Sequence, residues 1–188
     1  MWDRRTDDFR ETNCMSRCQK LASAVAVTVT RLSLAAWVGA AMLFVITSVE
    51  EQRSPAFDSV IRDQLATLRF PWYYIFGTIC LSSALVCSAF GALLSTGFIR
   101  KRLLATSLLT ILSSGIALAD YAYVYSPLQH LIEPPGKSRT QDFIVLHERS
   151  RLINEIHLGL ALLAAVVICV PESQSKYCCP AAPPAGIL

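Results

Sequence analysis

The polar side chains that could do chemistry gather where two apolar segments end. Ser150 and Asn154 come three and seven residues after His147, so a helix places the three on one face, with His157 flanking that face. Asp120 lies near the end of another apolar segment. Ionisable groups at membrane depth are functional candidates by default, so these five residues form the expected polar pocket.

Two interpretations of this pocket stay open. The side chains could act as helix caps and as hydrogen bonds between helices, which needs no ligand. Alternatively, the neutral imidazole of His157 could ligate a metal ion or a haem iron, with His147, His130 or Asp120 as a second ligand. On a straight helix, His147 and His157 lie about 80° apart. That separation favours the packing interpretation, in which no cofactor is bound.

Motifs of known enzyme classes are absent from the sequence. It has no glycine-rich phosphate loop, no Gly-x-Ser-x-Gly elbow and no kinase or dinucleotide fingerprint. The run from His147 to Arg151 lacks the second histidine of the zinc-protease pattern. We therefore expect no catalytic residues. The sequence also lacks the interleaved basic and aromatic residues of nucleic-acid binders.

The elements that must position the pocket are long apolar helices. Hydrophobic residues make up 53% of the 188 residues and charged residues 16%, and the mean hydropathy is +0.44. A membrane crossing takes about 20 mostly apolar residues. Four segments meet this requirement, at about residues 21–49, 72–98, 103–126 and 152–170. The predicted fold is therefore all-α, an integral membrane four-helix bundle.

The predicted transmembrane domain covers residues 21–171. A charged head (residues 1–20) and a short tail (residues 172–188) are expected to be poorly ordered. Arg31 interrupts the first segment, but residues 32–49 are long enough to cross alone, so we expect the membrane to begin near Arg31.

The distribution of basic residues predicts the orientation. Arg and Lys are slightly more numerous in the head, the tight turn at residues 99–102 and the tail than in the other loops. The positive-inside rule then places both termini in the cytoplasm, and we expect a multi-pass protein of the cell membrane. The net charge of +3 suits contact with anionic lipids of the bilayer.

Cysteines and small residues suggest further contacts. A stripe of Cys80, Ser83, Cys87 and Gly91 would let another helix approach closely, including one from a second copy in a homo-oligomer. Cysteine pairs also flank the membrane domain, namely Cys14 with Cys18 and Cys178 with Cys179. Unpaired thiols are favoured for these four, with metal binding or acylation as alternatives.

Five short motifs resemble one membrane protein family. They are residues 32–39 (LSLAAWVG), 54–57 (SPAF), 70–74 (FPWYY), 126–128 (SPL) and 143–150 (FIVLHERS) followed by Asn154. This pattern resembles the four-span family that includes transmembrane protein 205 (domain of unknown function 4149), over roughly residues 30–170. The resemblance implies a compact four-helix bundle, in which the family's last-span motif maps onto Phe143, His147, Ser150 and Asn154.

Because no sequence motif indicates an activity, the expected function is only a general class. The sequence favours a non-enzymatic membrane module with a structural, stress-response or small-solute-handling role. The alternative is a redox, metal-binding or haem-binding membrane protein that uses histidines at the outer ends of the third and fourth spans.

Overall fold

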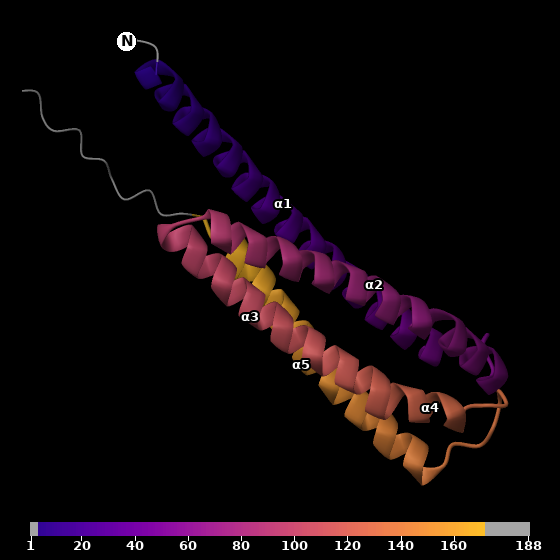
Figure 1. Ribbon diagram of the computed structural model, residues 1–188. Helices are drawn as coiled ribbons and strands as arrows, with labels where there is room; N and C mark the ends of the chain where they lie inside the picture. The colour runs from indigo at the N-terminus through magenta and orange to yellow at the C-terminus, as the bar shows by residue number, and fades with distance from the viewer. Residues whose placement is uncertain (1–3, 172–188) are drawn as a thin grey trace, which may run out of the picture.

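The computed structural model describes the backbone of residues 4–171 and the side chains of residues 17–171. Within that range the chain is helical and contains no strand. The elements are α1 (Arg4–Arg53), α2 (Ser59–Leu94), α3 (Gly97–Asp120), the π-helical turn η1 (Tyr121–Tyr125), α4 (Ser126–Leu131) and α5 (Gln141–Cys169). Figure 1 shows α1, α2, α3 and α5 running along one another as an elongated bundle. In the described part of the chain, four helices are long and apolar enough to cross a membrane, which confirms the predicted fold class.

The helices begin and end at other residues than the hydropathy pattern predicts. The segment 50–71, expected as a loop, is helical except for residues 54–58, because α1 ends at Arg53 and α2 begins at Ser59. Asp58 caps α2 by accepting a hydrogen bond from the backbone N–H of Ile61 at 2.9 Å. Thr140 caps α5 in the same way through the N–H of Phe143 at 3.2 Å. The last helix therefore begins well before residue 152.

Two further expectations differ from the structure. The basic residues 100–102 lie in the first turns of α3 and not in a tight turn, since the connection from α2 is only Ser95 and Thr96. Residues 4–20, expected as a poorly ordered head, form the beginning of α1. Polar residues can continue a helix beyond the lipid. Hydropathy therefore indicates which residues lie in the membrane, but not where each helix begins and ends. The tail, with Cys178 and Cys179, lies outside the described residues, as does the side chain of Cys14.

Small residues line much of the interior together with a few large ones such as Leu34, Trp37 and Leu103, while most large apolar residues face outward. Buried positions include Gly77, Ala84, Ser88, Gly91, Thr106, Thr110, Ala161 and Ala164. Exposed positions include Leu43, Ile79, Val86, Leu108 and Leu162. This distribution suits a bundle in lipid, where small side chains let backbones approach and the outer surface needs no polar cover. Of the predicted stripe on α2, Cys80 and Gly91 are buried, whereas Ser83 and Cys87 lie at the margin of a buried face that runs through Ala84 and Ser88.

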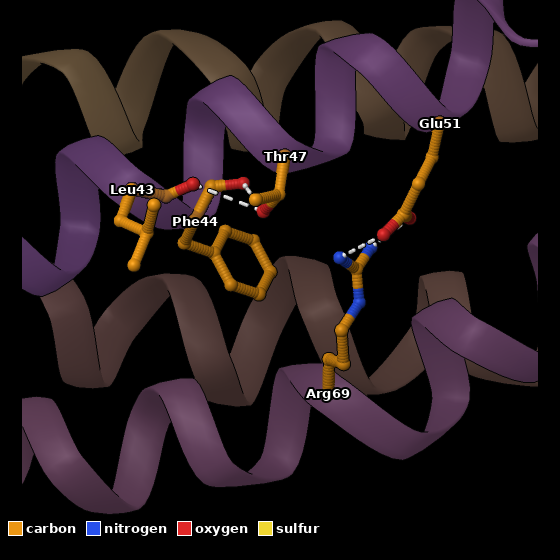
Figure 2. A network of polar contacts seen from close by, with 5 residues as sticks. All are labelled: Leu43, Phe44, Thr47, Glu51 and Arg69. Carbon is orange, nitrogen blue, oxygen red and sulfur yellow. Dashed lines mark hydrogen bonds and ion pairs between the residues drawn. The ribbon is translucent and has the colours of Figure 1, made fainter.

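The bundle has two chemically different ends. We call the end with the α2–α3 turn and the C-terminus of α5 the basic end, and the end with the α1–α2 turn and η1 the aromatic end. At the aromatic end, Arg69 of α2 donates two parallel hydrogen bonds to the carboxylate of Glu51 on α1, each 2.5 Å long (Figure 2). The same guanidinium lies 5.4 Å from the ring centroid of Phe44. Figure 2 also shows Thr47 bonded to the carbonyl groups of the preceding turn of α1.

The loop between α4 and α5 is fastened to α2. Asp63 of α2 is buried and forms an ion pair with Arg139. Its other carboxylate oxygen accepts a hydrogen bond from the backbone N–H of Gly136 at 2.9 Å. Gly136 has φ +84°, a conformation that favours glycine. The position is also crowded, since a Cβ there would lie 2.6 Å from a methyl carbon of Val60.

Candidate functional site

The π-helical turn η1 determines which side chains the aromatic end can bury. The backbone N–H of Ser126 bonds to the carbonyl of Tyr121, five residues earlier, instead of the usual four. This wider turn lets Asp120 face the interior together with Val124 and Tyr125, and all three are buried. In a regular helix Asp120 and Tyr125 would lie about 140° apart. Single π turns inside α-helices occur frequently at functional sites.

A hydrogen-bond network connects α2, α3 and α5 through Asp120, which is 1% exposed. One carboxylate oxygen, Oδ2, accepts from the hydroxyl of Tyr74 at 2.6 Å, the hydroxyl of Ser150 at 3.3 Å and the amide Nδ2 of Asn154 at 3.3 Å. The hydroxyl of Tyr73 donates to Oδ1 of Asn154 at 3.2 Å. The structure thus brings Asp120, Ser150 and Asn154 together, and it adds two tyrosines to them.

These donors offset the cost of burying an acidic group at this depth. The second carboxylate oxygen of Asp120, Oδ1, is buried without a hydrogen-bond partner in the described part of the chain. The hydroxyl of Tyr125 is likewise buried and unpaired. The network therefore ties three spans together and leaves some hydrogen-bonding capacity unused.

Tyr73 and Tyr74 stand at the start of the second apolar segment, where tyrosine is typical of a belt at the membrane surface. Their rings instead pack inside the aromatic end, where Tyr74 lies 4.9 Å from Tyr125 and 5.1 Å from Tyr121 between ring centroids. Tyrosine is common at both locations, so residue type could not separate them. Spacing gives no signal either, because adjacent residues lie about 100° apart on a helix and the inner face holds both of them.

His157 lies deeper in the bundle than the Asp120 network. It is 2% exposed, and its ring centroid lies 5.7 Å from that of Trp37 on α1. The hydroxyl of Ser113 on α3 donates to the backbone carbonyl of His157 at 2.9 Å and lies 3.3 Å from the imidazole Nδ1. His157 is thus held by packing and by one serine, and neither Trp37 nor Ser113 was among the expected site residues.

His147 lies apart from the other expected residues. It is exposed, and its ring stacks on Phe143 of the same helix at 5.7 Å and an interplanar angle of 7°. His130 is also exposed. Among the residues that the structure describes, no group of three or more His, Cys, Asp or Glu side chains could hold a metal ion. The geometry therefore does not favour a pair of histidine ligands at His147 and His157.

A cavity of about 390 Å³ lies between α2 and α3 beside this site. Its polar wall includes Tyr74 of the Asp120 network together with Trp37 and His157. The indole Nε1 of Trp37 is buried and has no hydrogen-bond partner in the described residues. The helices contribute mostly apolar or small side chains, among them Ile75, Thr78, Ser82, Ser114, Ala117 and Leu118. A cavity of this kind can hold a small molecule that is mainly apolar and has one polar group.

Comparisons with known proteins found no match: no protein-family model, no curated protein and no solved structure is significantly similar to this chain. Function must therefore be argued from the geometry.

Proposed function

We propose that this multi-pass membrane protein is a non-enzymatic module that binds a small amphipathic molecule in the cavity between α2 and α3. The observation that carries the proposal is the cavity itself, whose volume of about 390 Å³ lies in the range of ligand pockets. Its position between two apolar helices gives a lipid-soluble molecule a route from the bilayer. This function corresponds to small-solute handling.

The lining indicates what kind of molecule fits. Apolar side chains of α2 and α3 would cover most of the ligand surface, which favours a hydrocarbon body. The buried Nε1 of Trp37 is a donor only and has no partner in the described bundle, so a ligand oxygen that reached it would complete its hydrogen bonding. A neutral long-chain alcohol has both features, an apolar chain and one oxygen that accepts a hydrogen bond.

The polar network supports binding rather than catalysis. Tyr74, Ser150 and Asn154 all donate to Asp120, so their polar atoms are engaged with one another. A catalytic base or nucleophile would need a free path to a substrate atom. The network is better suited to fixing the mouth of the cavity, because Tyr74 belongs to both.

The proposal includes the orientation and the family. With the basic end in the cytoplasm, as the positive-inside rule favours, the cavity belongs to the outer half of the cell membrane. The motifs shared with the transmembrane protein 205 family support membership in that family.

Quenching of Trp37 fluorescence by a brominated alcohol tests the binding site. Trp2 and Trp72 are first replaced by Phe, which leaves Trp37 as the single indole. Dodecanol brominated at C2, next to its hydroxyl group, is then titrated into the purified protein in mild detergent. We expect saturable quenching, because bromine quenches indole fluorescence at short range and the cavity has a limited capacity.

Two variants on the same helix provide the comparison. Ala117→Phe places a ring in the cavity and should abolish the saturable phase, whereas Ala105→Phe lies on the exposed surface of α3 and should preserve it. Quenching that rises linearly with the alcohol and is equal in both variants would contradict the proposal, since it would report only partition into the detergent.

A further inference from the structure

Two arginines from different helices meet at the C-terminus of α5. The Nε–H of Arg31 on α1 donates to the carbonyl oxygen of Ile168 at 3.0 Å. The Nε–H of Arg102 on α3 donates to the carbonyl oxygen of Val167 at 2.9 Å. Both carbonyl groups belong to the last turn of α5, where no later backbone N–H of the helix can bond them. The two guanidinium groups therefore bond to carbonyl groups of adjacent residues at the basic end.

Most of the hydrogen-bonding capacity of this pair is unused. Each guanidinium has five N–H donors, and the contacts with α5 use only the Nε–H. The Nη2 of Arg102 is buried without a partner in the described residues. The C-terminus of a helix carries about half a negative charge, which leaves an excess of roughly 1.5 positive charges. The pair thus has uncompensated charge, and the exposed guanidinium of Arg31 has N–H donors available for an anion.

No acidic side chain of residues 17–171 neutralises this charge. The five ion pairs of that range involve Arg53, Arg69, Arg139 and Arg151, all toward the aromatic end. On α1 the nearest acidic side chain after Arg31 is 19 residues away at Glu50, about 28 Å along the helix. On α3 the nearest after Arg102 is Asp120, about 27 Å away. The positive charge is compensated by no part of the described bundle.

The surroundings are suited to a lipid. Arg31 lies directly before the apolar run 32–49, at the depth where the hydrocarbon layer is expected to begin. Large apolar side chains are exposed beside the arginines, with Leu32 next to Arg31, and Phe98 and Leu104 close to Arg102 along α3. These side chains would contact acyl chains, whereas a free anion would gain nothing from them.

We propose that Arg31 and Arg102 form a binding site for the phosphate group of an anionic phospholipid. The guanidinium fork matches the oxygen atoms of a phosphate, and the ligand would complete the charge balance at the end of α5. This site lies at the opposite end of the bundle from the cavity between α2 and α3 and shares no residue with it. The two proposals can therefore fail independently.

Retention of lipids by the purified protein tests the site. The protein in neutral detergent is mixed with equal amounts of phosphatidylglycerol and phosphatidylcholine, and bound lipids are counted by native mass spectrometry. We expect preferential retention of one phosphatidylglycerol. Retention should fall about fivefold in Arg102→Gln, as expected for the loss of one basic residue at an anionic membrane surface.

A matched control removes the same charge without removing the site. Arg100 is exposed and lies two residues from Arg102, so Arg100→Gln should retain the lipid as the parent protein does. Equal losses in the two variants would overturn the proposal, because they would indicate diffuse charge attraction. Equal retention of phosphatidylcholine, or displacement of the lipid by inorganic phosphate at millimolar concentration, would also overturn it.

A second variant separates binding from folding. Arg102→Lys keeps the charge and can still bond a carbonyl of α5, but it lacks the planar fork. We expect reduced lipid retention with an unchanged thermal unfolding midpoint in lipid-free detergent. Full retention in this variant would refute a site that depends on guanidinium geometry.

Discussion

Replacing Gly77 by Ala should destabilise the bundle through a single contact. The added Cβ would lie 2.6 Å from Cη2 and 2.7 Å from Cζ3 of the Trp37 indole. Ordinary carbon contacts begin at about 3.5 Å, so the ring must move by roughly 0.9 Å. Trp37 is 2% exposed and packs against Tyr73 and His157 at 4.9 and 5.7 Å between ring centroids. Overpacking of this kind costs about 1–3 kcal/mol.

Alanine substitutions at two other glycines serve as controls, which separate the cost of the clash from the higher helix propensity of alanine. Alanine is favoured over glycine in a helix by about 1 kcal/mol, and this gain would partly hide the clash in a single measurement. Gly39 and Gly115 are also helical, and a Cβ at either position meets no atom within 4 Å. The difference between Gly77→Ala and these controls should therefore be the clash alone, about 1–3 kcal/mol.

The assay is reversible unfolding of the purified protein in mixed micelles, followed by circular dichroism as the denaturing detergent increases. The clash should disappear when Trp37 is replaced by Phe, whose shorter ring lacks the colliding atoms, so the double variant should show a coupling energy of about 1–3 kcal/mol. A Gly77→Ala protein as stable as Gly39→Ala would refute the close contact between Gly77 and Trp37. That contact would also be refuted if Gly77→Ala cost the same stability in a protein with Phe at position 37.

Three further predictions concern polar contacts at the aromatic end. Asp63→Ala releases the loop that follows α4, so trypsin should cleave after Lys137 about fivefold faster or more. Asp120→Ala leaves the hydroxyl groups of Tyr74 and Ser150 without their acceptor and should lower the free energy of unfolding by about 1–3 kcal/mol in the same micelle assay. Arg69→Lys replaces the two parallel bonds to α1 by a point charge and should cost about 1 kcal/mol, whereas Arg53→Lys, in an exposed pair at 4.0 Å, should cost nothing measurable.

Each of these three predictions has a result that would contradict it. An unchanged trypsin rate would show that the loop is held by contacts other than Asp63. Unaltered stability without the Asp120 carboxylate would mean that its donors find other partners, such as water. Equal losses of stability from lysine at positions 69 and 53 would show that the two parallel bonds of Arg69 do not stabilise the bundle more than an exposed ion pair does.

The existence of the four spans could be predicted from sequence because a membrane crossing requires about 20 apolar residues, whatever their packing. The helix ends could not be predicted in the same way. Residues 59–70 are polar enough to read as a loop, yet the cap at Asp58 and the contacts of Asp63 and Arg69 keep them helical. Those contacts join residues far apart in the chain, and hydropathy carries no information about them.

The candidate site could likewise be predicted only in part. Depth arguments placed Asp120, Ser150 and Asn154 at one level of the membrane, and the structure joins them directly. Helical periodicity also placed His147 on their face, but that residue lies nearer the N-terminus of α5 and contacts Phe143 of its own helix. Periodicity gives the direction of a side chain and not whether a neighbouring helix reaches it.

The π-helical turn of residues 121–125 makes the aromatic end tolerant of a change in chain length. It contains one residue more than an α-helical turn would need, since the N–H of Ser126 reaches back five residues. Deleting one residue there would restore regular winding, and Tyr125 would then follow Asp120 by four residues, about 40° from it on the helix. The orientation of Tyr125, and with it the approach of the loop to Asp63, would therefore change little. A one-codon deletion elsewhere in a span would instead rotate everything after it by about 100°.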